Sequence, residues 1–299
     1  MAVPSRLCSL RIVIFRVRRC AFLALLPLVL VSACAGHKPG GPKQAAKLVP
    51  YSDAQVPPFA RAPYEPFARA DVVAIAQREW HMFGQLVDDD PPGTRPPPAP
   101  EDKPERWPGF WERVGEYWWL GLSTDSRESG WTGKHGDGGI EFPAREDGLY
   151  AWSAAFISYV MRIAGAGPRF PYGASHSDYI DLAKQERLTP TGAWLIQAMR
   201  PEEYAPAPGD LICTGRGRAA SLRYDDLPAG RYPAHCDIVV DTRAPGQISV
   251  IGGNVDDAVT MKHVPVTTDG KLATPEGVVL DTRYPWMVVL KLQVAAPVS

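Results

Sequence analysis

Three polar residues in the second half of the chain have the types and the order of a nucleophilic hydrolase site. Ser153 opens an apolar stretch that predicts a helix, His235 lies in a short β-type segment, and Asn254 ends a later one. The N-terminus of a helix offers unpaired N–H groups and a positive dipole end, which stabilise an anionic nucleophile or an oxyanion. A serine also needs a base that takes its proton and a third group that stabilises the protonated base.

The elements that must position these residues follow from hydrophobic periodicity. Helical spacing comes first along the folded region and strand patterns follow: helices at 69–87, 109–122, 153–164 and 175–187, then strands at 210–214, 235–241, 247–252, 259–266 and 286–293. Successive short strands with turn residues between them imply an antiparallel sheet. Helices followed by strands predict an α+β fold.

Four short motifs carry a resemblance to CHAP-like and NlpC-type cysteine peptidases. Residues 152–158 (Trp-Ser-Ala-Ala-Phe-Ile-Ser) resemble their Trp-Cys-Ala-Ala-Phe-Val-Ser stretch, and residues 208–212 (Pro-Gly-Asp-Leu-Ile) their Pro-Gly-Asp-Leu-Val turn. Residues 234–239 (Ala-His-Cys-Asp-Ile-Val) resemble their Gly-His-Val-Gly-Ile-Val strand, and residues 251–254 (Ile-Gly-Gly-Asn) the end of their next strand. The order and spacing of the four motifs are more specific than any one of them.

The whole chain, with Trp-Ser where those peptidases have Trp-Cys, is similar to the bacterial domain-of-unknown-function family 2272. The resemblance implies a papain-like fold in which N-terminal helices pack on an antiparallel β-sheet. By position it implies that Ser153 is the nucleophile, His235 the base and Asn254 the residue that orients the base.

Asn254 is poorly suited to a serine site, because replacing aspartate by asparagine in a serine triad lowers turnover on the order of ten-thousand-fold. Two nearby sources of a carboxylate remain open. Asp237 is two residues from His235 and therefore lies on the same face of a strand. Asp256 and Asp257 follow Asn254 directly.

Simpler interpretations stand beside the catalytic one. Ser153 is equally well placed as the N-cap of its helix. His235 is also compatible with a structural role in a strand. His176 begins another predicted helix, where we favour capping over a role as a second base. The scattered histidines show no metal-ligand spacing, so we expect no metal and no cofactor.

The N-terminus predicts export and lipidation. Residues 1–33 hold five arginines, no acidic residue and an apolar stretch that is short for a membrane span. Val31-Ser32-Ala33-Cys34 resembles a lipobox, which implies cleavage before Cys34 and lipidation of its thiol. The next residue, Ala35, favours the outer membrane over inner-membrane retention. An ordinary cleaved signal peptide is the alternative.

The predicted organisation is a signal peptide (1–33), a Pro-rich tether (34–68) and one domain (69–294) with a Pro-rich loop at 88–108. Removing residues 1–33 from totals of 32 basic and 33 acidic residues leaves 27 against 33, a net charge of −6. This acidic balance argues against a nucleic-acid partner. Cys213 and Cys236 remain in the domain, and the sequence leaves open a disulfide or two buried thiols.

Three functions remain in competition. The first is a lipid-anchored, outer-membrane hydrolase that faces the periplasm and cleaves peptide amides of peptidoglycan or a similar acyl bond. The second is a degenerate papain-like domain that binds peptidoglycan or a partner without cleaving it. The third is a structural lipoprotein. A carboxylate within hydrogen-bond reach of His235 favours the first over the second.

Overall fold

The computed structural model describes residues 67–294, apart from positions 92, 95, 97, 273–275, 277, 279–280 and 282. The predicted signal peptide, Cys34 and almost all of the predicted tether lie outside the described residues. No helix within the described part of the chain has both the length and the apolar composition needed to cross a membrane.

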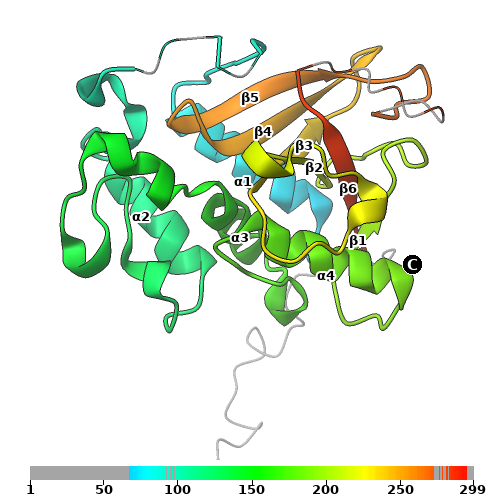
Figure 1. The fold of residues 1–299 in the computed structure, drawn as a ribbon, viewed down its shortest axis with the longest axis horizontal. Helices are drawn as coiled ribbons and strands as arrows, with labels where there is room; N and C mark the ends of the chain where they lie inside the picture. Colours follow the sequence, from blue (N-terminus) through cyan, green and yellow to red (C-terminus); the bar gives the residue numbers. More distant parts are fainter. Residues whose placement is uncertain are drawn as a thin grey trace, which may run out of the picture. The chain divides into compact units, whose positions relative to one another are not determined.

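The domain is α+β, as the sequence predicts, and the helices precede the strands (Figure 1). The helices are α1 Arg69–Met82, α2 Phe110–Gly121, α3 Ser153–Ile163 and α4 His176–Leu188. The strands are β1 Ile196–Met199, β2 Leu211–Gly215, β3 Ala234–Asp241, β4 Gln247–Val255, β5 Ala258–Pro265 and β6 Trp286–Leu292.

The strands form one antiparallel sheet with the order β1-β6-β2-β3-β4-β5. The edge strand β1 is absent from the sequence prediction, because its four residues are too few to show a period. Helix α1 ends at Met82 and not at Val87, since Gly84 and Gln85 both adopt positive φ angles (87° and 61°) that a helix cannot continue.

Helix α3 is the central element of the apolar core, and its first nine residues are all buried. It packs against α2 on one side and against β3 and β4 on the other. Two glycines permit this close packing. A Cβ on Gly121 of α2 would lie 2.7 Å from the Ala155 carbonyl oxygen, and one on Gly253 of β4 would lie 2.6 Å from Phe156. Larger residues at either position would push α3 away from its neighbours.

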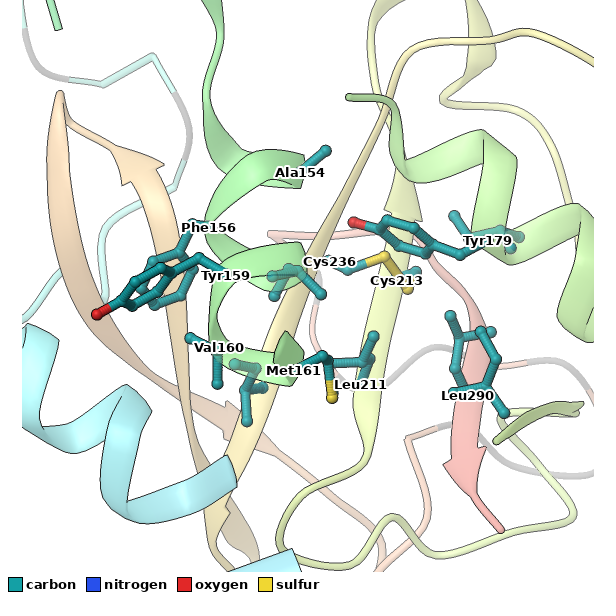
Figure 2. Close-up of a cluster of buried hydrophobic side chains, with 14 of the residues drawn as sticks. Ala154, Phe156, Tyr159, Val160, Met161, Tyr179, Leu211, Cys213, Cys236 and Leu290 are labelled. Carbon is teal, nitrogen blue, oxygen red and sulfur yellow. A yellow bond between two sulfur atoms is a disulfide. The ribbon is translucent and has the colours of Figure 1, made fainter. Parts of the chain in front are cut away.

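A disulfide joins β2 to β3 beneath the helices. Cys213 and Cys236 are directly opposite in the antiparallel register, with Cα atoms 4.2 Å apart, and their sulfur atoms are bonded. Both are fully buried and lie near Tyr179 and Met161 (Figure 2). The structure thus resolves the two alternatives of the sequence in favour of the disulfide.

Removing the Cys213–Cys236 disulfide should destabilise the domain without changing its fold. The bridge closes a loop with a sequence separation of 23 residues, and opening a loop of this size costs about 2–4 kcal/mol of unfolding free energy. Denaturant unfolding of the double variant Cys213→Ala/Cys236→Ala against wild type measures the loss. Alkylation of both thiols in denatured protein that has never met a reductant would contradict the bridge.

Candidate functional site

Ser153 is the first residue of α3, and its hydroxyl points to a histidine. The N-cap position belongs to Trp152, and no side chain caps this helix end. The Ser153 Oγ lies 2.7 Å from the Nε2 of His176, and the residue is 7% exposed. The interpretation of Ser153 as an N-cap is therefore wrong, because its hydroxyl bonds to an imidazole and not to a backbone N–H of its helix.

His176 is the first residue of α4, and its ring lies inside the protein at 4% exposure. Its Nδ1 forms a hydrogen bond with the hydroxyl of Tyr179, one helical turn further along. The capping role favoured from the sequence is wrong, since the side chain links Ser153 to Tyr179. The only signal in the sequence was the spacing of three between His176 and Tyr179, which places both on one helix face.

His235 belongs to a second polar chain, on β3. Its Nε2 lies 2.9 Å from the Oδ1 of Asp237, and the Oδ2 of Asp237 lies 2.7 Å from the Nζ of Lys262 on β5. All three side chains are buried, and Asp237 is fully so. One of the two predicted carboxylate sources, Asp237, is therefore within hydrogen-bond reach of His235.

Ser153 and His235 share no hydrogen bond within the described part of the chain, which contradicts the pairing expected from the resemblance. The reason lies in the alternation of side chains along β3. Cys236 and Ile238 pack with the helices in the main core, so His235 and Asp237 point to the opposite face of the strand. His176 contacts both Ser153 and His235: it shares a hydrogen bond with Ser153, and its ring centroid lies 5.4 Å from that of His235.

Gly252 of β4 lies against the His235–Asp237 pair. A Cβ at this position would lie 2.0 Å from the Oδ1 of Asp237 and 2.9 Å from the Nε2 of His235. Contacts of this length do not occur for a real side chain. The first glycine of the Gly-Gly-Asn motif therefore makes room for the hydrogen bond between His235 and Asp237, while the second, Gly253, makes room for α3.

Asn254 does not orient His235, whose partner is Asp237. It is the second-last residue of β4 and has a left-handed conformation with φ 56°. Asp256 and Asp257, which follow Val255, have φ angles of 51° and 59°. The carboxylate of Asp257 lies 3.1 Å from the Nζ of Lys103 and so pairs with a lysine outside the histidine cluster.

Burial keeps both histidines neutral. Desolvation lowers the pKa of His176 well below its usual value, and the positive potential of its neighbours adds to this. Desolvation also lowers the pKa of His235, although Asp237 opposes the change. Burial alone would raise the pKa of Asp237, but Lys262 and His235 outweigh it and hold that pKa below its usual range. At pH 7 the cluster thus contains two neutral imidazoles and one buried ion pair.

Two polar cavities meet beside this cluster. One, of about 380 Å³, is lined by His235 and Lys262, and the other, of about 730 Å³, by Lys103 and Asp147. The residues common to both linings are Arg216, Asn254 and Asp256. Ser153 lines neither of them. Within residues 67–294, leaving out the gaps, no three His, Cys, Asp or Glu side chains form a candidate metal site.

A buried carboxyl supports the start of α3. The indole Nε1 of Trp152 donates a hydrogen bond of 2.6 Å to the Oε2 of Glu105. Burial, together with the nearby Asp257 carboxylate, raises the pKa of Glu105 to about 8. Glu105 is therefore mainly protonated at pH 7, and its loss of a proton above that pH leaves a buried charge beside the candidate site.

The raised pKa of Glu105 predicts a loss of stability as the pH rises. The folded state holds the proton up to about pH 8, whereas the unfolded chain releases it near 4.5, so the unfolding free energy falls between these values. Glu105→Gln mimics the protonated carboxyl and should be more stable than wild type at pH 8 by on the order of 4 kcal/mol, with little difference at pH 5.

Denaturant unfolding at pH 5 and pH 8 measures this effect, with the exposed Glu101→Gln as the matched control. Parallel pH profiles of wild type and Glu105→Gln would contradict it. The other titrating groups are common to both proteins and cancel in the comparison.

The comparisons with known proteins give one match. The model of a family described as "Uncharacterized protein conserved in bacteria (DUF2272)" matches residues 105–292. No curated protein and no solved structure matches the chain. The matched region covers more than half of the chain and contains Glu105, Ser153, both buried histidines and the whole sheet. The chain is a member of the DUF2272 family of bacterial proteins.

Proposed function

We propose that this protein is a cell-envelope lipoprotein whose domain hydrolyses a peptide amide, such as those of peptidoglycan, or a similar acyl bond. Ser153 is the nucleophile of this proposal, and His176 takes the position of base that the sequence assigned to His235. The single observation that carries it is the 2.7 Å hydrogen bond between Ser153 Oγ and His176 Nε2. A nucleophile bonded to a base, which is itself held by a third group, is the recurring arrangement of covalent hydrolases.

The proposed reaction begins with transfer of the hydroxyl proton. In the tautomer that donates its Nδ1–H to the Tyr179 oxygen, His176 accepts the Ser153 proton at Nε2. The Ser153 Oγ then bonds to the substrate's carbonyl carbon, and the amine leaves with the proton from Nε2. Water attacks the acyl ester in the second half and gives a proton to Nε2 of His176. His176 returns this proton to the Ser153 Oγ as the ester bond breaks, which releases the acid and restores the serine.

The supporting groups are weaker than in an efficient serine hydrolase. Tyr179 is a neutral partner, because burial raises its pKa well above the usual value. The Asp237 carboxylate favours a protonated His176, but desolvation outweighs it. A protonated His176 therefore forms at a considerable cost, and we expect slow turnover.

One observation favours a second candidate function, binding without cleavage. Ser153 lines neither cavity, whereas His235 lines the smaller one. The second candidate is therefore a degenerate papain-like domain that holds peptidoglycan or a partner protein beside His235 and does not use Ser153 as a nucleophile.

The proposed location rests on the sequence of the N-terminus and is compatible with the disulfide. Disulfides persist in oxidising compartments such as the periplasm, and a bond between Cys213 and Cys236 suits an exported domain. A lipid on Cys34 would hold the domain at the outer membrane, facing the periplasm.

Hydrolysis by Ser153 predicts a defined pattern among variants. Ser153→Ala should reduce release of products from purified peptidoglycan by roughly a thousandfold or more, while losing about 1 kcal/mol of stability with the hydrogen bond to His176. His176→Ala should be as inactive as Ser153→Ala. Ser158→Ala is the matched control, because Ser158 is a buried serine of the same helix that bonds to the Gly173 backbone.

The remaining outcomes separate the alternatives. A larger loss in His235→Ala than in His176→Ala would return the role of base to His235. Activity only in Ser153→Cys would identify a degenerate amidase site, since a thiolate needs less support from its base. No product from wild type or from any variant would reject hydrolysis and support the binding function.

Lipidation of Cys34 predicts a change of location in Cys34→Ala. The variant should lose incorporation of labelled fatty acid and should no longer follow the outer membrane on fractionation, because a cysteine thiol is the acceptor of the lipid. Cys20→Ala, in the predicted signal peptide, serves as the control. Label retained in Cys34→Ala would contradict the lipobox.

A further inference from the structure

Arg216 is placed where the two cavities meet, in the segment that follows β2. It is exposed and lines both cavities. Its guanidinium forms no hydrogen bond and no ion pair with the rest of the described chain. An arginine at the junction of two cavities, with no side-chain partner among the described residues, is available to an anionic ligand.

The other cations of the smaller cavity already have carboxylate partners. Lys262 lies 2.7 Å from Asp237, and Arg283 lies 2.9 Å from Asp281. These pairs are built into the protein and offer little net charge to a ligand. The available positive charge at the junction is therefore that of Arg216.

We propose that Arg216 binds the carboxylate of an N-acylated amino acid or short peptide, and that this ligand is the substrate class of the Ser153 site. The second half of the inference rests on the proposed function, whereas the first half is a binding site that stands without turnover.

The charges of the cavity favour a carboxylate over a phosphate. The guanidinium plane binds two oxygens of a carboxylate or of a phosphate in a bidentate hydrogen bond, so the choice between the two anions depends on charge. Asp88 and Asp256 line the same cavity. Carboxylates nearby repel a doubly charged anion more strongly than a singly charged one, which favours a carboxylate ligand.

The neighbour of Arg216 at the junction suits a peptide group. Asn254 lines both cavities, and its side-chain amide offers both a donor and an acceptor. An amide bond next to the bound carboxylate can satisfy both. Together, Arg216 and Asn254 offer hydrogen-bond partners for the carboxylate and for the adjacent amide at the end of an acylated peptide.

Binding at Arg216 would also act on the two histidines. The charge of Arg216 opposes protonation of both His176 and His235. A carboxylate bound to Arg216 offsets this charge and makes it easier for His176 to accept the Ser153 proton. The ligand thereby improves the base that the proposed reaction requires.

The test compares two probes, N-acetylalanine and its uncharged amide, by calorimetric or NMR titration of the mature protein. Wild type should bind the carboxylate at least tenfold more tightly than the amide. Arg216→Gln should bring the ratio close to one. Arg218→Gln, an exposed arginine two residues away that lines neither cavity, should keep the wild-type ratio, and thermal unfolding confirms that both variants fold.

Equal binding of the two probes to wild type, no detectable binding of the carboxylate, or a preference that survives in Arg216→Gln would overturn the inference. Because binding is measured without turnover, the result is independent of the Ser153 variants. A carboxylate preference in a protein that cleaves nothing would leave the site as a binding site and would reject only the proposed hydrolysis.

Discussion

The buried carboxylate of Asp237 is the interaction on which the polar site depends. A fully buried charge is strongly destabilising unless it is paired and hydrogen-bonded, and Asp237 has Lys262 on one oxygen and His235 on the other. These partners lie on β3 and β5, on either side of β4, where Gly252 leaves space for them. Removing any of the three side chains would leave another buried group without its partner. The cluster therefore fixes the position of β3 relative to β5 across β4.

A second constraint places the serine. Helix α3 is held between α2 and β4 by the close approach at Gly121 and Gly253, and the indole of Trp152 is tied to Glu105. These contacts define where α3 begins and hence where the Ser153 hydroxyl lies. Its partner His176 comes from the start of α4, so two helix N-termini meet at the hydrogen bond that carries the proposed function.

Electrostatics explain why hydrolysis and binding remain close competitors. Both histidines are neutral and therefore able to accept a proton, but burial makes the protonated state costly. The carboxylate that would stabilise it is already balanced by Lys262. The charge of Arg216 lies at the cavity junction and opposes protonation of both histidines as well. An anionic ligand changes this balance, which connects the occupancy of the cavities to the chemistry of Ser153.

Periodicity in the sequence was sufficient for the α+β class, the order of helices before strands and the antiparallel sheet, because apolar spacing reports directly which face of an element is buried. It also placed Asp237 on the same strand face as His235, because residues two apart in a strand point to the same face of the sheet. The four-residue β1 escaped prediction because so short a segment has no measurable period.

Tertiary structure alone decided which groups meet. The pairing of Ser153 with His176 depends on the face of β3 that packs against α3, and Cys236, not His235, occupies that face. The disulfide likewise depends on the register that sets Cys213 opposite Cys236. Sequence spacing determines the direction of a side chain relative to its own element. The distance between two elements is set by packing across the core. Here Gly121 and Gly253 decide how closely α2 and β4 approach α3, and Gly252 decides how closely β4 approaches the side chains of His235 and Asp237.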